Sequence, residues 1–245
     1  MVIDFHSHAL PGLDDGSRNA EMSVGMLRAA RQQGVELQVL TPHFYRWKED
    51  ISSFAERRRE SCGVLKKELP RDIPALLVGS ETAFFPHMSR EDLSELCIEG
   101  TRVLLVEMPF ESWEGHVTDE IARLSLDCGY HVVLAHIERF LRYKGNAEEL
   151  LRLQQLPIHI QSNAEVFLSF MSRSLGLKLI KSGTVTILGS DAHNLDDRRP
   201  NLGPARETIA KRLGLDVLAR IDSEATALLG RVAEMVAPPR KETVK

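Results

Sequence analysis

An alternation of short apolar runs with helical patterns constrains the fold most strongly. Apolar, β-branched runs recur at residues 2–5, 36–41, 75–79, 103–107, 132–136, 158–162 and 185–189. Helical patterns occupy residues 18–33, 50–68, 116–128, 146–156, 164–182, 203–213 and 223–236. Strands separated by helices pair in parallel through right-handed crossovers. Because no convincing eighth strand follows, the pattern predicts an α/β fold, a distorted (β/α)7 barrel.

The chain is expected to form one domain. Its 245 residues suit a single α/β barrel, and a composition of 43% hydrophobic and 27% charged residues supports a folded core. A further short helix is predicted to begin at Ser89, with Asp92 at its third position. We therefore expect a catalytic domain over residues 1–236 and a flexible tail over residues 237–245.

Charge and hydropathy exclude several function classes. A net charge of −4 gives no basic surface for nucleic acid or for an anionic membrane. No apolar run approaches the roughly 18 residues that a membrane span needs, and no secretory signal precedes the first strand. We therefore expect a cytoplasmic protein without direct membrane insertion.

The cysteines point away from disulfide and thiol chemistry. Cys62, Cys97 and Cys128 are odd in number and widely spaced, which does not suit a disulfide framework or a thiolate zinc site. Arg102 follows Cys97 by five positions, whereas the Cys-x5-Arg motif of cysteine-dependent phosphatases requires six. A nucleophilic cysteine of that kind is not expected.

Histidines and carboxylates gather where the predicted strands end. In a barrel, the carboxyl ends of the strands and the following loops form the active face. The side chains at this end are His6, His8, Asp15, His43, Glu81, Glu107, His136, Asp191 and His193. Any one of them alone would more often be a structural residue, but six strands delivering such groups to one end indicate a shared site.

The chemistry of these nine side chains predicts a metal site. In His-x-His, the period-two alternation of an extended segment sends His6 and His8 to the same side. The set contains no cysteine, so manganese, iron or zinc suits it. Nine ligands exceed what one ion takes, and we therefore expect two or three ions that share bridging carboxylates.

The ordered stretches "DFHSH", "DDG", "TPH", "GSE", "AHIER" and "SDAHN" resemble the PHP family, named for polymerase and histidinol phosphatase. More narrowly, they resemble its bacterial manganese-dependent protein-tyrosine phosphatases, which are encoded beside capsule and exopolysaccharide genes. The resemblance runs from about residue 2 to about residue 230. It implies a distorted (β/α)7 barrel and a trinuclear centre that often contains Mn²⁺.

The resemblance also assigns roles. It implies that one ion is held by His6, His8 and Asp191, and that Glu81 bridges it to a second ion held by Glu107 and His136. Asp15, His43 and His193 would then hold the third ion. Arg139 and Arg198 match the phosphate-binding arginines of the family. Arg199 is adjacent, so either Arg198 or Arg199 could bind phosphate, and the spacing from His193 favours Arg198.

These roles imply a phosphoric monoester hydrolase. A hydroxide that bridges two ions would attack the phosphorus of phosphotyrosine, since metals lower the pKa of bound water towards roughly 7. The resemblance implies, as substrate, the tyrosine-rich tail of an autophosphorylating kinase of exopolysaccharide synthesis. Two alternatives stay open: a phosphoesterase for a small metabolite such as histidinol phosphate, and a non-catalytic regulatory module that binds metal.

For some residues near the predicted active face, the sequence is consistent with two different roles. Tyr45, Arg46 and Trp47 follow His43 and form either an aromatic rim for phosphotyrosine or a surface packing group. His116 is either a substrate contact or a solvent-facing side chain. The segment 161–170 departs from the small, glycine-containing pattern of relatives, which leaves its part in substrate preference open. The sequence does not determine the oligomeric state.

Overall fold

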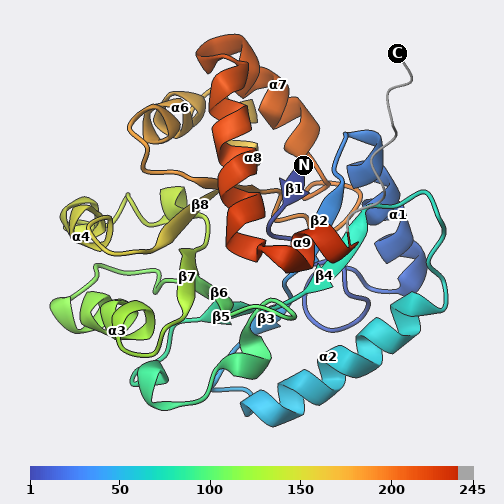
Figure 1. Ribbon diagram of the computed structural model, residues 1–245, viewed down its shortest axis with the longest axis horizontal. Helices are drawn as coiled ribbons and strands as arrows, with labels where there is room; N and C mark the ends of the chain where they lie inside the picture. Colours follow the sequence, from blue (N-terminus) through green and yellow to red (C-terminus); the bar gives the residue numbers. More distant parts are fainter. Residues whose placement is uncertain (237–245) are drawn as a thin grey trace.

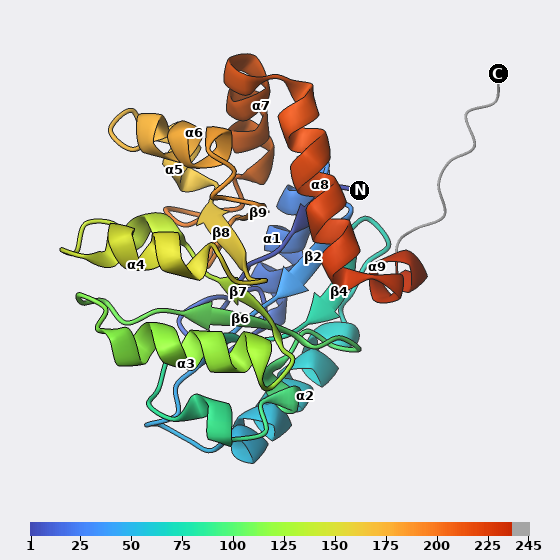
Figure 2. The ribbon, with the colours of Figure 1, turned by 60° about the vertical axis from the view of Figure 1, so that its left-hand side comes forward.

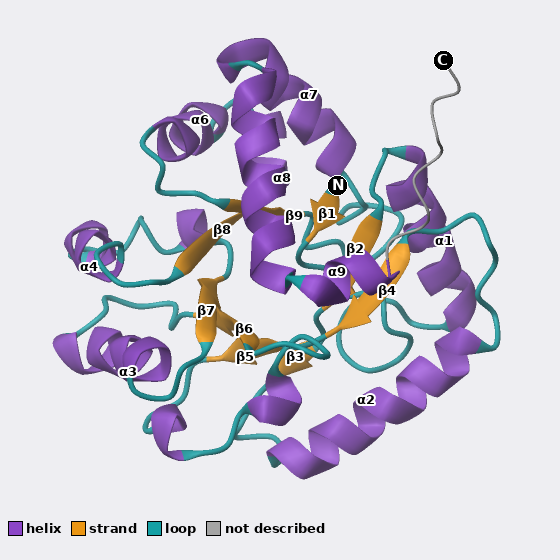
Figure 3. Cartoon of the chain, viewed as in Figure 1, coloured by secondary structure: helices purple, strands orange, loops and turns teal. Residues whose placement is uncertain are grey.

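A computed structural model of the chain describes residues 1–236. Nine short strands form its centre: β1 (Ile3–Asp4), β2 (Leu37–Leu40), β3 (His43–Phe44), β4 (Ala75–Val78), β5 (Glu81–Ala83), β6 (Val103–Glu107), β7 (His131–Leu134), β8 (His159–Asn163) and β9 (Ile187–Gly189). Every strand pairing among them is parallel. The strands form a ring surrounded by helices (Figure 3).

The ring has seven positions because two of the predicted strands are each split. The sheets have the orders β1-β2-β4 and β3-β5-β6-β7-β8-β9. β3 continues the path of β2 after Thr41 and Pro42, and β5 continues the path of β4 after two residues. Pro42 has no N–H to donate to a ladder, but its carbonyl accepts from Glu81 N at 2.9 Å. β9 meets β1 through the hydrogen bond from Phe5 N to Leu188 O, at 3.2 Å. The structure confirms the predicted distorted (β/α)7 barrel.

Helices cover the outside of the barrel and one of its ends. They are α1 (Ala20–Gln32), α2 (Ile51–Lys66), α3 (Gly115–Leu126), α4 (Asn146–Leu153), α5 (Glu165–Leu168), α6 (Arg173–Lys181), α7 (Leu202–Leu213), α8 (Leu215–Leu229) and α9 (Arg231–Val236). α8 and α9 lie across the amino ends of the strands (Figure 1). The carboxyl ends and their loops lie on the opposite side, at the left of Figure 2.

The two faces of β6 show how the alternating pattern builds the core. Leu104 and Val106 pack in one hydrophobic cluster with the helix residues Ile121 and Leu124. Leu105 packs in a second cluster with strand residues of the barrel and with small side chains of α8 and α9. Period-two alternation then places Glu107, the last residue of β6, on the same face as Leu105.

Three helix predictions differ from the structure. No α-helix begins at Ser89: the segment forms two short 3₁₀ turns, Met88–Arg90 and Ser94–Leu96, because Asp92 Oδ1 accepts locally from Ser94 N at 3.0 Å. The helix expected over 223–236 begins already at Leu215, directly after Gly214, and Gly230 divides it into α8 and α9. The helix expected over 164–182 is divided by a turn into α5 and α6. The expected tail, 237–245, lies outside the described residues.

Glycine is required where β9 approaches β1. A Cβ at Gly189 would lie 2.5 Å from His6 Cβ and 3.1 Å from His6 N. We expect Gly189→Ala to lower the free energy of unfolding by about 1–3 kcal/mol, since backbone and a buried ring would have to shift. Gly63→Ala is the matched control, because a Cβ there in α2 meets nothing within 4 Å and should stabilise by about 0.5–1 kcal/mol. Urea unfolding of metal-free protein measures both, and equal midpoints for Gly189→Ala and the unmodified protein would contradict the expectation.

Candidate metal centre

The structure brings all nine predicted side chains to the carboxyl end of the barrel. His6 and His8 follow β1, Asp15 lies in the next loop, His43 begins β3, Glu81 begins β5, Glu107 ends β6, His136 follows β7, and Asp191 and His193 follow β9. All are buried except Asp15 and His43, whose side chains are 63% and 12% exposed. A buried set of this kind needs compensation from paired charges or from metal ions.

The carboxylate of Glu81 lies at the middle of the cluster. Its Oε1 is 2.6 Å from His136 Nε2, and its Oε2 is 2.9 Å from His43 Nδ1. The same Oε2 lies 3.2 Å from His6 Nε2 and 3.3 Å from His8 Nε2. One carboxylate thus faces four imidazoles, an arrangement that suits a bridging ligand.

Three further carboxylates complete the cluster. Asp191 Oδ1 lies 3.3 Å from His8 Nε2, and Glu107 Oε1 lies 3.5 Å from His136 Nε2. Asp15 Oδ1 is 3.5 Å from both His43 Nε2 and His193 Nε2. Ligand atoms within 4.8 Å of one another form three groups: His8 with Asp15, His43 and His193; His6 with His8 and Glu81; and His43 with Glu81 and Glu107.

Several of these atoms have no hydrogen-bond partner. Glu81 Oε2, His43 Nδ1 and His193 Nε2 are buried and unsatisfied among the described residues. His43 Nδ1 and Glu81 Oε2 approach to 2.9 Å without making a hydrogen bond. Buried polar atoms are nearly always paired, so lone pairs that converge without donors fit a bound cation. With only nitrogen and oxygen donors, the site fits borderline or hard divalent metals.

The pKa values of Glu81 and Glu107 are shifted because charged groups lie close together in the cluster. Burial alone would raise the pKa of Glu81, but the nearby imidazoles of His6, His43 and His136 outweigh it and hold that pKa well below its usual range. Burial, followed by the Glu81 charge, raises the pKa of Glu107 to about 8. Like charges that crowd in this way are relieved when a cation lies between them.

Asp14 is a functional residue that the sequence reasoning did not assign. Its Oδ2 lies 2.7 Å from His8 Nδ1 and also accepts from His43 N at 2.9 Å. The carboxylate therefore leaves Nε2 of His8 facing the cluster, as carboxylate–histidine pairs do in metal sites. The available signal was the doubled aspartate of "DDG", in which the first residue orients and the second faces the site.

Gln161 and Asn163, at the end of β8, are a second group that sequence reasoning missed. Gln161 Oε1 accepts from His136 N at 2.7 Å and lies 3.3 Å from His6 Nδ1. Asn163 Nδ2 donates to Asp191 Oδ2 at 2.8 Å. These amides fix the orientation of three ligand candidates, and their signal in the sequence was only the alternate polar residues of "QSN".

Two site residues adopt a left-handed backbone that only glycine tolerates easily. His136 has a φ of 30° and Asp191 a φ of 53°. Each lies two residues beyond the end of the strand that carries it, and Asp191 N donates to His6 O at 2.8 Å. Such strain persists where the surrounding structure imposes it, and it is concentrated at functional sites.

Both predicted arginines reach the cluster at Asp191. Arg139 Nη2 donates to Asp191 Oδ2, and Arg198 Nη2 donates to the same oxygen at 3.1 Å. Arg198 Nη1 lies 3.7 Å from Asp15 Oδ2. Arg199, in contrast, is exposed, and it makes no hydrogen bond or ion pair among the described residues. The two guanidinium groups thus lie beside the carboxylate cluster with about one third of each side chain exposed.

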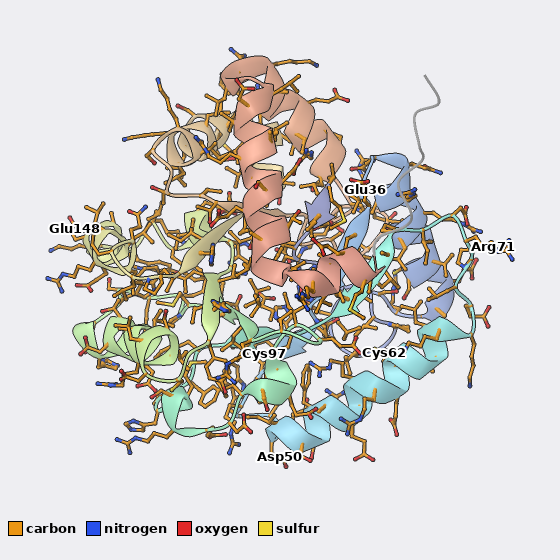
Figure 4. All side chains as sticks on the ribbon, in the orientation of Figure 1. Glu36, Asp50, Cys62, Arg71, Cys97 and Glu148 are labelled. Carbon is orange, nitrogen blue, oxygen red and sulfur yellow. The ribbon has the colours of Figure 1, made fainter. Side chains whose placement is uncertain are left out.

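The cysteines and the remaining histidines lie apart from the cluster. Cys62 lies on α2, and Cys97 lies in the segment that follows β5 (Figure 4). Both line a cavity of about 440 Å³ outside the barrel. Burial raises the pKa of both thiols, which does not favour a nucleophilic thiolate. The side chain of His116 is 68% exposed and lies 3.4 Å from Glu114 Oε2, so the structure gives it no contact with the site.

A parallel barrel with histidines and carboxylates at the carboxyl ends of its strands defines the chain as an α/β-barrel protein with a candidate metal centre. More particularly, the chain belongs to the family described as "Capsular polysaccharide synthesis, CpsB/CapC", whose model matches residues 2–229. It is 28% identical to the tyrosine-protein phosphatase YwqE of Bacillus subtilis over 98% of this chain and 96% of YwqE. It is 26% identical to the tyrosine-protein phosphatase CpsB of Streptococcus pneumoniae over 87% of this chain and 91% of CpsB.

The fold comparison agrees. A crystal structure from work on YwqE of Bacillus subtilis and CpsB of Streptococcus pneumoniae, described as unique metal-dependent tyrosine phosphatases, superposes with a TM-score of 0.79. The match covers 93% of this chain and 94% of that one at 24% identity. The family match and the named relatives confirm the predicted relationship to this group of phosphatases, and the superposition shows that the fold is shared over nearly the whole chain. Within residues 1–236, no helix combines the length and apolar character needed to cross a membrane.

Proposed function

We propose that this protein is a metal-dependent phosphatase that hydrolyses phosphotyrosine in proteins. The observation that carries the proposal is the cluster itself: nine side chains with nitrogen and oxygen donors, Glu81 at their middle, and two guanidinium groups at the edge. Guanidinium groups recognise phosphate through charge-assisted hydrogen bonds. Relatives that bear the name tyrosine-protein phosphatase, in a family of capsular polysaccharide synthesis, support the same substrate class.

We propose Mn²⁺ as the physiological metal, with iron or zinc as substitutes, and two or three ions per chain. His6, His8 and Asp191 would hold one ion, bridged through Glu81 to a second ion held by Glu107 and His136. Asp15, His43 and His193 would hold the third. His8 is grouped with Asp15, His43 and His193 as well as with His6 and Glu81, which is why the division of ligands among ions is part of the proposal.

The chemistry requires little more than this donor set. Bound divalent ions lower the pKa of a coordinated water towards about 7 and offset charge on the phosphoryl group. Arg139 and Arg198 would bind the remaining phosphoryl oxygens and stabilise charge that develops there. A tyrosine phenolate, with a pKa of about 10, leaves without much help from an acid. Arg139 and Arg198 would release Asp191 Oδ2 and donate to the phosphoryl oxygens of the substrate instead.

The physiological substrate that we propose is the tyrosine-rich tail of an autophosphorylating kinase of exopolysaccharide synthesis, dephosphorylated in the cytoplasm. The test is a panel of phosphotyrosine peptides, phosphoserine peptides and histidinol phosphate, assayed with manganese and with excess chelator. We expect the tyrosine peptides to be hydrolysed fastest, and chelation to abolish turnover that manganese restores. Faster turnover of histidinol phosphate, or full activity in excess chelator, would contradict the proposal.

Asp14 provides a test of how the ligands are oriented. Asp14→Asn should weaken manganese affinity about 10- to 100-fold, because His8 loses the carboxylate that fixes its ring nitrogen. Calorimetric titration of metal-free protein with manganese measures the change. The control is Asp72→Asn, an exposed aspartate paired with Arg28, which should leave manganese affinity unchanged. Unaltered affinity in Asp14→Asn would show that His8 is oriented without it.

A further inference from the structure

One side of the metal centre is lined by a stack of aromatic rings. The Tyr45 ring stacks on His43, with centroids 5.1 Å apart and planes inclined by 24°. Trp47 packs behind Tyr45 at 4.7 Å, and Lys48 Nζ lies 4.2 Å from the Tyr45 centroid. Tyr45 is half-buried, whereas the Trp47 side chain is largely exposed. The Tyr45 ring, which packs on the ligand candidate His43, is therefore held in place by contacts with Trp47 and Lys48.

A second aromatic ring stands at the other side. Phe110 follows β6 by three residues, lies 6.4 Å from the His136 ring with planes inclined by 24°, and is 47% exposed. It also packs on Phe140 at 4.9 Å. A phenylalanine that is half exposed beside a buried polar cluster has no partner on its open side among the described residues.

The loop that carries Phe110 is held rigidly. Trp113 Nε1 donates to Pro109 O at 3.1 Å, and Trp113 N donates to Asn146 Oδ1 at 2.7 Å. Asn146 Nδ2 donates in turn to Glu111 O at 3.0 Å. These hydrogen bonds fix the backbone on both sides of Phe110, so the ring is presented in one place at little cost in conformational entropy on binding.

Glu81 defines how the two rings are related. His43, which carries Tyr45 against it, contacts Glu81 Oε2, while His136, which carries Phe110 against it, contacts Glu81 Oε1. Each ring therefore packs against a different imidazole that contacts the bridging carboxylate. Arg139 and Arg198 reach the cluster at Asp191 instead, so the arginines and the rings occupy different parts of its rim.

We propose that Tyr45 and Phe110 form the two walls of a subsite for the aryl ring of the phosphate ester. The assignment rests on the proposed function, because it takes the phosphoryl group to lie over the metal ligands and beside the arginines. The ring of phosphotyrosine then lies between the two aromatic side chains, and aromatic pairs favour offset or edge-to-face contact. A phosphoserine side chain has no ring to place there, so the subsite selects aryl over alkyl esters.

The test compares phosphonates that cannot be hydrolysed. Phenylphosphonate and methylphosphonate are titrated into manganese-loaded protein by calorimetry, with inorganic phosphate as a third probe. The unmodified protein should bind phenylphosphonate more tightly than methylphosphonate. Phe110→Ala and Tyr45→Ala should each weaken phenylphosphonate about 2- to 12-fold, the range for an aromatic pair, and leave methylphosphonate and phosphate unchanged. Phe110→Tyr should restore the preference.

Phe170→Ala is the matched control, since Phe170 is 91% exposed and no aromatic contact joins it to the described residues. It should leave all three affinities unchanged. An unaltered ratio of phenylphosphonate to methylphosphonate in both Phe110→Ala and Tyr45→Ala overturns the subsite. An equal loss for all three probes also overturns it, because the rings would then act only by supporting His43 and His136. Binding is measured without turnover, so failure of the proposed function would appear separately, in the peptide panel.

Discussion

Glu81→Gln is expected to reduce phosphatase activity more than about 100-fold. Loss of a residue that only orients a metal ligand typically costs about 10- to 100-fold, and a bridging ligand should matter more. The substitution keeps the shape of the side chain but removes its negative charge and replaces one carboxylate oxygen with an NH2 group, which donates hydrogen bonds and cannot bind a cation. Glu81 contacts His6, His8, His43 and His136, so the change affects every part of the cluster. Elemental analysis should find fewer than the two or three ions expected per chain.

A control is needed for the loss of a buried negative charge. Glu120 is also buried, but it accepts from Ser89 N at 2.7 Å and pairs with Arg123, outside the cluster. Glu120→Gln should keep the metal content and the activity of the unmodified protein. If Glu81→Gln retained both full metal content and activity, Glu81 could not be a bridging ligand.

Arg198→Ala should lower kcat/KM for a phosphotyrosine peptide roughly 10- to 150-fold while the metal content stays complete. A hydrogen bond to a charged group contributes about 1.5–3 kcal/mol, which corresponds to that range. Guanidinium stays protonated and has no lone pair to give a cation, so its loss should not release metal. The structure favours Arg198 over its neighbour, since only Arg198 reaches Asp191 Oδ2.

Arg199→Ala is the matched control and should change kcat/KM little, because the Arg199 side chain is exposed. Asp191→Ala should differ from both arginine variants by losing metal together with activity. A large effect of Arg199→Ala and almost none of Arg198→Ala would reverse the assignment. If neither arginine variant lost activity, phosphate binding would depend on the metals and Arg139 alone.

The barrel and the gathering of reactive side chains could be predicted because both follow from periodicity. Parallel strands bring their carboxyl ends to one edge, so residues as distant as His6 and Asp191 could be placed together from the sequence. By contrast, the sequence did not indicate whether Asp14 or Asp15 would contact His8. That choice depends on the loop geometry that lets Asp14 accept from both Gly16 N and His43 N.

Polar contacts between residues far apart in the chain could not be predicted from the sequence either. Gln161 and Asn163 act on residues of other strands, and an isolated strand pattern does not reveal a partner more than 20 residues away. The helix expected at Ser89 failed for a related reason. Ser89 N donates to Glu120 of α3, and a contact of this kind can override a local capping signal. The division of 164–182 into α5 and α6 likewise follows from Arg173, whose side chain bonds to the Phe167 and Leu168 carbonyls.

The position of Asp191 couples two binding events. Its Oδ1 faces the imidazoles of His6 and His8, while its Oδ2 accepts from Arg139, Arg198 and Asn163. In the proposed metal centre, a cation on the first oxygen would withdraw charge from the second and loosen the hold of Asp191 on the arginines, which would free them for an external anion. Thermodynamic reciprocity then requires that metal ions tighten phosphate binding by the same factor by which phosphate tightens metal binding. In cells, the supply of divalent metal would therefore set not only how much enzyme is active but also how strongly product phosphate inhibits it.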